Sequence, residues 1–277
     1  QADLLGYSNL IVTLDNDKKE LQGFAEISDG RFQLDTSSPY PVWKKSVKPK
    51  VLDSLIKTPL TEKISKRQKL AASAPAPTVV GESEKDAAGN YVIDVYMGFS
   101  KQAAAFIDNN IQARAEMEVN MVNTALKNSN VQGVYLRLVG VGITANNPGV
   151  TWDPLDMAYE WFKSDIARLQ PDLIAVQQVQ TGAPNSAGGW AGIGGDTEVV
   201  DIDLPGAWVH EVGHSIGGVH CKDDDPDNTG YNYGYSVREG RGTVMCGNDI
   251  LYYSSPLIRD EQGNILEEYR DRPSQVL

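Results

Sequence analysis

The chain has 277 residues, of which 41% are hydrophobic and 22% are charged, a balance typical of a folded globular protein. Its formal net charge of −12 argues against a nucleic-acid partner, because the phosphates would be repelled. No apolar run approaches the roughly 20 residues that a membrane-spanning helix requires, so we expect no membrane span.

Residues 1–75 predict a small β-rich unit that continues into a basic segment. Strand-like runs flank two turn signals, Asn16-Asp17 and Asp29-Gly30, each of which is typical of a hairpin. Between positions 43 and 70, nine basic residues stand against two acidic ones. Such a segment is either a solvated linker or a strip that docks on the acidic remainder of the chain. We expect a short helix at residues 51–56 within it.

Residues 76–89 are rich in alanine, proline, serine and glycine, which predicts a linker between two domains. Residues 90–277 then alternate between strand-like and helix-like patterns. Strands are expected at 91–100, 134–144 and 172–179, and helices at 101–127 and 153–170. The alternation indicates an α/β domain with a twisted, mostly parallel sheet.

The two expected helices have different signals. The apolar positions of the first fall on one face, at Ile107, Ile111, Ala115, Val119, Val122 and Leu126. The second carries a helix-start signal, with Asp153 as the N-cap and Pro154 in the first turn.

A glycine-rich stretch indicates a candidate antiparallel edge strand, at Gly189, Trp190, Ala191, Gly192, Ile193 and Gly194. It does not match the dinucleotide-binding pattern G-x-G-x-x-G, because Thr197 stands at the last glycine position counted from Gly192.

All three histidines of the chain lie in the stretch HEVGHSIGGVH, residues 210–220. Residues 205–216 predict a helix, on which His210 and His214 are one turn apart and point to the same side. Two glycines then end the helix, and the reversed chain can bring His220 back as a third ligand. Three neutral imidazoles leave a fourth position open on Zn²⁺, which is typical of a catalytic site rather than a structural one.

Glu211 follows the first of these ligands and is predicted to be the general base. A catalytic zinc ion lowers the pKa of a water molecule and polarises a carbonyl group, and Glu211 would accept the proton of that water and pass it to the leaving amine. The pattern H-E-x-x-H alone also occurs by chance on helices. Its extension to Gly217 and His220 strengthens the interpretation as a metal site.

The combined motif resembles the signature H-E-x-x-H-x-x-G-x-x-H of the metzincin metallopeptidases. Members of that superfamily also have a methionine turn below the zinc ion, and the segment GTVMC supplies a matching Met245. The resemblance implies a zinc endopeptidase with a long active-site helix. It also implies that a polypeptide substrate would lie antiparallel to the edge strand at 189–194.

Within the superfamily, the segments YGYSV, RGTVMC and LYYSSP are most similar to reprolysin-like enzymes, especially secreted bacterial ones resembling peptidyl-Asp metallopeptidases. The stretch at 23–41 resembles the end of reprolysin-type propeptides. This similarity implies that residues 1–75 are a pro-segment and that the chain is a zymogen. Since no cysteine precedes Cys221, inhibition would depend on a carboxylate such as Asp29 or Asp35, or on steric cover. A permanent accessory domain is the alternative.

The two cysteines of the chain directly follow a site residue each, Cys221 after His220 and Cys246 after Met245. This placement favours one disulfide and therefore an exported protein, although two free buried thiols are the alternative. The acidic stretch at 222–228 leaves calcium binding open, but it fails the EF-hand pattern because Asn228 replaces the required glycine.

A protein from a different functional class would also fit the fold. It would be a binding or adhesion protein that keeps the metzincin architecture and uses zinc only structurally. The presence of Glu211 favours the enzyme, because the general base has no role in a structural site.

Overall fold

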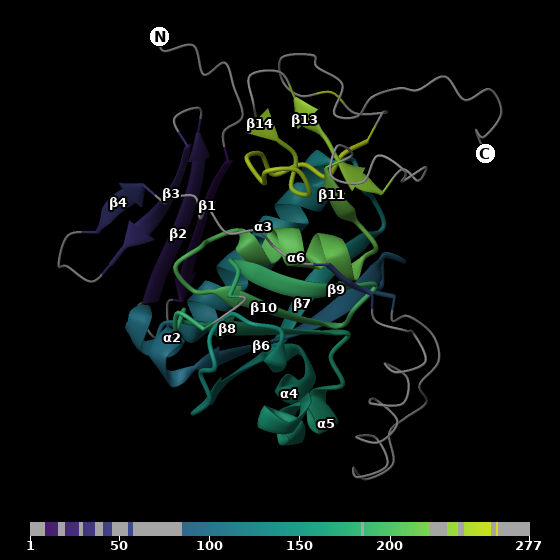
Figure 1. The fold of residues 1–277 in the computed structure, drawn as a ribbon. Helices are drawn as coiled ribbons and strands as arrows, with labels where there is room; N and C mark the ends of the chain where they lie inside the picture. The colour runs from purple at the N-terminus through teal and green to yellow at the C-terminus, as the bar shows by residue number, and fades with distance from the viewer. Residues whose placement is uncertain are drawn as a thin grey trace.

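The fold comes from a computed structural model, which describes residues 9–15, 20–27, 30–36, 41–45, 55–57, 85–183, 186–221, 232–237, 241–255 and 259. In these residues a four-stranded N-terminal sheet lies beside a six-stranded central sheet with helices on both of its faces (Figure 1). The expected mixed α/β class is therefore confirmed.

The N-terminal sheet is antiparallel, with its strands in chain order. It consists of β1 (Asn9–Asp15), β2 (Glu20–Ile27), β3 (Gly30–Asp35) and β4 (Val42–Lys45). The pairs Asp15–Glu20 and Ile27–Gly30 close the two hairpins, whereas the turn residues 16–17 and 28–29 lie outside the described ranges. The β-rich character expected for this part of the chain is confirmed.

The central sheet has the strand order β5-β9-β10-β8-β6-β7. Its strands are β5 (Leu55–Lys57), β6 (Tyr91–Ser100), β7 (Val134–Thr144), β8 (Leu173–Gln178), β9 (Gly189–Ile193) and β10 (Thr197–Asp201). Strands β10, β8, β6 and β7 run parallel, and β9 is antiparallel to β10. A mostly parallel sheet with an antiparallel strand near one edge is thus confirmed.

The helix expected at 101–127 is in fact two helices, α2 (Lys101–Phe106) and α3 (Ile111–Asn128). The chain turns between them because Asp108 and Asn109 adopt left-handed conformations, with φ of 54° and 63°. The helix expected at 153–170 is also divided, into α4 (Asp153–Trp161) and α5 (Lys163–Leu169). Its N-cap is Trp152 rather than Asp153, so the predicted cap was wrong by one residue.

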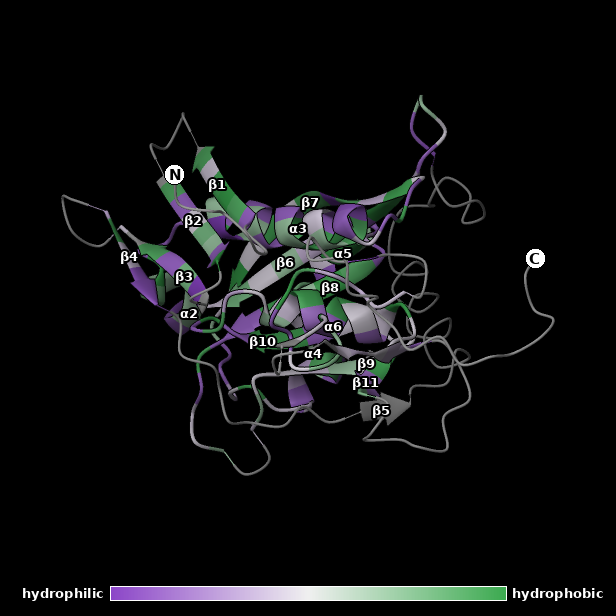
Figure 2. Cartoon of the chain, turned by 90° about the horizontal axis from the view of Figure 1, so that it is seen from above, coloured by the Kyte–Doolittle hydropathy of each residue, from purple (hydrophilic) through white to green (hydrophobic). Residues whose placement is uncertain are grey.

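The core has two layers, one on each face of the central sheet. On one face, α3 and α6 (Ala207–Ser215) cover Val95, Met97 and Phe99 of β6. On the other face, α4 and α5 cover Tyr96, and Phe162 packs against its ring at 5.3 Å. Figure 2 shows hydrophobic and hydrophilic residues alternating along α3, as a helix with one buried face requires.

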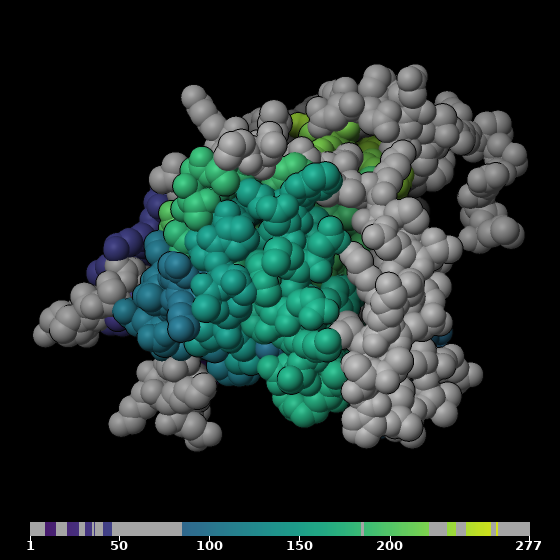
Figure 3. Space-filling view, turned by 60° about the horizontal axis from the view of Figure 1, so that its bottom comes forward, coloured from purple at the N-terminus to yellow at the C-terminus, as the bar shows by residue number. Residues whose placement is uncertain are grey.

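The N-terminal sheet packs on α3 through its inner face, and the fully buried Phe24 of β2 belongs to the same core cluster as α3 and α6. Figure 3 shows the N-terminal strands at one side of the molecule, beside the segment around residue 100. The first strands of the chain therefore contribute to the main hydrophobic core.

Four short strands follow α6 in the chain and form two two-stranded sheets: β11 (Val219–Cys221) with β12 (Tyr233–Gly234), and β13 (Ser236–Val237) with β14 (Arg241–Gly242). The helix expected at 51–56 was wrong where it can be checked, since residues 55–57 form β5. Most of the expected linker, residues 76–84, and the acidic stretch 222–228 lie outside the described ranges. Among the described helices, none has the length and apolarity needed to cross a membrane.

Candidate metal centre

Helix α6 carries His210, Glu211 and His214, and it lies across strands β9 and β10. It begins after Gly206, whose φ of 87° lets the chain enter the helix through a left-handed turn. The helix spans nine residues, whereas α3 spans 18. The long active-site helix implied by the resemblance is therefore not present, although the histidines lie on a helix as expected.

The glycines after α6 reverse the chain, as their position in the sequence indicates. Gly217 has a φ of 102°, and its N–H donates to the carbonyl oxygen of His214 at 2.9 Å. The next N–H, from Gly218, donates to the carbonyl oxygen of Gly213 at 2.7 Å. The chain then continues as β11, which contains His220.

The three histidine rings lie close together. Their ligand atoms all lie within 4.8 Å of one another, and the Nε2 atoms of His214 and His220 are 3.2 Å apart. His214 is fully buried, whereas His210 and His220 are partly exposed. The site is therefore anchored in the protein interior and can be reached from solvent.

Backbone carbonyl groups fix the orientation of two of these rings. The Nδ1 atom of His210 lies 2.6 Å from the carbonyl oxygen of Val244, and Nδ1 of His214 lies 2.8 Å from that of Gly218. A carbonyl oxygen only accepts hydrogen bonds, so both Nδ1 atoms carry the proton and donate. In a neutral ring with this hydrogen bond, Nε2 keeps its lone pair, which is the tautomer that a metal ligand requires.

This donor set suits a zinc ion. Imidazole nitrogens are common zinc ligands, and three of them leave one coordination position for water or substrate. The second ring nitrogen of a zinc-binding histidine usually donates to a carbonyl or carboxylate group, and His210 and His214 already do so. The three histidines can therefore hold a metal ion without rearrangement of these two rings.

The Glu211 carboxylate lies against the backbone of strand β9. A Cβ atom added at Gly189 would be 2.7 Å from the Glu211 carboxyl carbon, closer than side chains pack. Glu211 itself is only 2% exposed. Glycine at position 189 thus leaves the space that the Glu211 carboxylate occupies against β9.

Met245 packs against α6 at Gly213. A Cβ atom at Gly213 would lie 3.2 Å from Met245 Cε and 3.1 Å from Tyr253 Cε1. Gly213 lies between the two helical histidines in sequence, so Met245 contacts α6 between them. The role of Met245 as a methionine turn stays a prediction.

Cys221 and Cys246 form a disulfide, as their positions indicated. The bond joins the residue after His220 to the residue after Met245. The segment that carries the third histidine is therefore fixed to the turn whose Val244 carbonyl orients His210.

Two further contacts hold α6 in place and were not expected from the sequence. Ser215 donates its hydroxyl to the buried Glu198 of β10 at 2.6 Å, and Tyr253 donates to the carbonyl oxygen of Val209 at 2.8 Å. Burial raises the pKa of the Tyr253 hydroxyl, and the nearby Glu198 raises it further, so Tyr253 stays protonated and keeps this bond. No local pattern distinguishes either residue.

The expected edge strand exists as β9, but it is not the edge of the described sheet. Strand β5 pairs with it in parallel, with Leu55 opposite Ala191, Ile56 opposite Gly192 and Lys57 opposite Ile193. Gly194, the last residue of the expected strand, lies outside β9 and donates its N–H to the carbonyl oxygen of His214 at 2.9 Å. The prediction of a free edge was therefore wrong for this state of the chain.

No protein-family model and no curated protein matches the chain. Among solved structures, it is similar to a chain in the structure of a chaperone–substrate complex, with a TM-score of 0.55 and 26% identity. That similarity covers 69% of this chain and 35% of the other, so this chain spans about a third of that protein. Metalloproteinase-II from Bacteroides fragilis has a TM-score of 0.47 and 11% identity, over 92% of this chain and 77% of that one. Function is therefore inferred from the site alone.

Proposed function

We propose that the chain is a secreted zinc-dependent endopeptidase. The observation that carries this proposal is the convergence of three histidines, two of them oriented by backbone carbonyl groups, with the buried Glu211 on the same helix as His210 and His214. A structural zinc site would not require a carboxylate at this position. The disulfide supports an exported protein, because such bonds persist in oxidising compartments.

Each residue of the site has a defined role in this proposal. When bound, zinc would act as a Lewis acid toward the scissile carbonyl and lower the pKa of a water molecule. Glu211 accepts the proton of the attacking water at a carboxylate oxygen and transfers it to the leaving amine nitrogen. Because Glu211 packs on Gly189, its carboxylate is held in one place for both transfers.

The pairing of strand β9 supports the proposal that the substrate is a polypeptide. Its pairing with β5 demonstrates that the β9 backbone accepts a further extended segment on the side away from β10. A substrate bound there would form main-chain hydrogen bonds that do not depend on its side chains. The preferred direction of the substrate is antiparallel to β9, as the resemblance implies.

The same pairing supports a latent form of the enzyme. Residues 55–57 occupy the β9 side on which the substrate would bind, and they run parallel to it, opposite to the direction proposed for a substrate. We infer that this strand acts as steric cover and must leave before a substrate can bind. Asp29 and the side chain of Asp35 lie outside the described part of the chain, so a carboxylate inhibitor remains an alternative.

The proposal is tested by zinc titration together with a hydrolysis assay. The chelated protein should bind one zinc ion per chain, and the loaded protein should degrade casein after displacement of the β5 segment by limited proteolysis. His214→Ala should lose both zinc binding and hydrolysis, because it removes the fully buried member of the three proposed zinc ligands and hydrolysis requires the bound zinc. The exposed Arg168→Ala serves as a control that should change neither quantity.

Two outcomes would count against the proposal. Failure to bind zinc would remove the metal centre. Tight zinc binding without hydrolysis, in protein whose β5 segment has been displaced, would instead favour a binding protein with a structural metal ion.

A further inference from the structure

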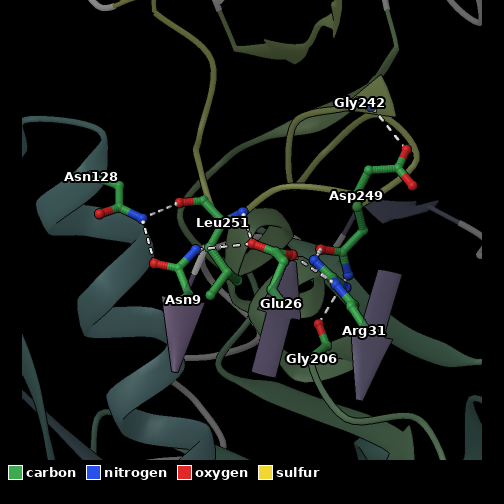
Figure 4. A network of polar contacts seen from close by, with 9 residues as sticks. Asn9, Glu26, Arg31, Asn128, Gly206, Gly242, Asp249 and Leu251 are labelled. Atoms are coloured by element: carbon green, nitrogen blue, oxygen red, sulfur yellow. Dashed lines mark hydrogen bonds and ion pairs between the residues drawn. The ribbon is translucent and has the colours of Figure 1, made fainter. Parts of the chain in front are cut away.

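A chain of polar contacts connects the N-terminal sheet to the segments that support the histidine cluster (Figure 4). It begins at Glu26 and Arg31 on β2 and β3. It ends at Asn248 and Leu251, which follow the methionine turn, and at Gly206, the residue before α6. These positions lie far apart in the sequence, since Arg31 and Asn248 are separated by 217 residues.

Glu26 is the first connecting residue. Its side chain is buried, with 1% of the residue exposed. The carboxylate accepts hydrogen bonds from Asn9 Nδ2 at 3.0 Å, from Arg31 Nε at 2.9 Å and from the N–H of Leu251 at 3.1 Å. The last of these bonds fixes the chain just after the methionine turn to the N-terminal sheet.

Arg31 is the second connecting residue, and Asn248 relays its contact. Nη2 of Arg31 donates to Oδ1 of Asn248 at 3.0 Å, and Nδ2 of Asn248 donates to the carbonyl oxygen of Gly206 at 2.9 Å. Asn248 follows the methionine turn, and Gly206 caps α6. Arg31 therefore reaches both segments that hold the histidines, through one amide side chain.

Side chains of helix α3 also contact the segments that support the histidine cluster. Asn128 donates to the carbonyl oxygen of Leu251 at 2.9 Å, so both backbone groups of Leu251 are bonded by side chains. The buried ion pair between Arg114 and Glu118, at 2.8 Å, lies beside the start of α6, and Arg114 also donates to the carbonyl oxygen of Ile202 at 3.0 Å. Burial raises the pKa of the Glu118 carboxyl, whereas Arg114 opposes this effect.

We propose that the N-terminal sheet is a permanent positioning unit of the metal centre, and that Arg31 and Glu26 are its positioning residues. The inference rests on the proposed metal site and adds a role for residues 9–45. Arg31 and Glu26 set the positions of Asn248 and Leu251, and these determine where the Val244 carbonyl meets His210. In this proposal the N-terminal segment has two parts. Strand β5 covers β9 and must leave before a substrate binds, whereas the sheet of β1 to β4 remains in place.

The position of the sheet supports this division. Its inner face contributes Phe24 to the main core cluster, with no exposed surface. Removal of the sheet would expose that core and leave the buried N–H of Leu251 without its acceptor, Glu26. A removable inhibitor would contact the substrate side of the site, whereas the described contacts of Arg31 and Glu26 are with the methionine-turn segment and other strands of the sheet.

The test is the zinc affinity of Arg31→Met, measured by competition with a chromophoric chelator. Partners that orient metal ligands from outside the coordination sphere typically change metal affinity about 10- to 100-fold. We expect a loss of roughly tenfold for this more distant residue. Arg31→Lys, which keeps the charge beside Glu26, should recover part of the loss. Arg137→Met removes an exposed arginine paired with Asp94 and serves as the matched control, with a change below about twofold.

A second variant covers the case in which Arg31→Met does not fold. Asn248→Asp keeps the acceptor for Arg31 and the size of the side chain, but it removes the donor to Gly206. It should also weaken zinc binding. The visible absorption spectrum of the cobalt-substituted protein should shift in both variants, because it reports ligand geometry rather than stability.

The outcomes separate this inference from the proposed function. If the unaltered chain binds no zinc, both are wrong. If the unaltered chain binds zinc, and a folded Arg31→Met or Asn248→Asp variant binds it equally tightly with an unchanged cobalt spectrum, only the positioning role is wrong. Weaker zinc binding with a shifted spectrum supports it.

Discussion

Glu211 and Gly189 are in direct contact, so that a Cβ atom at position 189 would lie 2.7 Å from the Glu211 carboxyl carbon. We therefore predict that Gly189→Ala displaces the carboxylate. A displacement of about 1 Å in a catalytic group can cost roughly 100-fold in rate. Peptide hydrolysis should fall by about this factor, while zinc affinity, measured by chelator competition, should stay within about twofold.

A double-variant experiment identifies the cause of that loss. If Gly189→Ala acts through Glu211, it should have little further effect in a Glu211→Gln background, because coupled residues are not additive. Additive losses in the two backgrounds would contradict the predicted contact.

The disulfide is predicted to stabilise the metal-free protein. Cys221 and Cys246 are 25 positions apart, and in the chain-entropy model a crosslink of this loop length contributes about 3 kcal/mol. Urea unfolding of the Cys221→Ser, Cys246→Ser double variant should give a free energy lower by about this amount. An unchanged urea midpoint at unchanged slope would show that the bond contributes no stability.

The β5 strand is predicted to slow substrate binding. Ile56→Pro removes a backbone donor and fixes φ, which weakens the pairing of this three-residue strand with β9. The initial rate of peptide cleavage by the intact chain should therefore rise several-fold, mainly through a lower KM. Ile56→Val keeps the strand propensity and serves as the control. Equal rates for both variants would argue against β5 as a cover.

Stability is predicted to depend on the ionisation of Asp201. Burial raises the pKa of this carboxyl above 3.8, although the N–H of Asp203 bonds to it at 3.1 Å and opposes the shift. A raised pKa means that the folded state binds the proton more tightly. The contribution to stability is therefore complete below 3.8 and is lost as the pH rises through the folded-state pKa.

Urea unfolding as a function of pH tests this statement. The free energy of unfolding of Asp201→Asn should decrease less over that pH range than that of the unaltered chain. Parallel pH profiles for the two proteins would contradict it.

Much of the central sheet could be predicted from local patterns. Strands β6 and β7 begin and end where their hydrophobic patterns do, at 91–100 and 134–144. The break between α2 and α3 could not be predicted in this way. Ile107 and Ile111 on its two sides both pack on the core, so the helical periodicity continues across it.

In the candidate site, too, local patterns predict some features and not others. The spacing of His210, His214 and His220 predicts their convergence, because two of them lie on one helix and the third follows the glycine turn that ends it. The pairing of β5 with β9 and the bond between Arg31 and Asn248 join distant parts of the chain. No local pattern indicates such contacts, since they depend on how the two sheets and α3 pack together.

The most direct test of the central claim is the hydrolysis of casein by Glu211→Ala at full zinc occupancy. The proposed role of Glu211 in proton transfer predicts a loss of about 100- to 10,000-fold relative to the unaltered chain, at equal bound zinc. Full turnover by the zinc-loaded variant would contradict it.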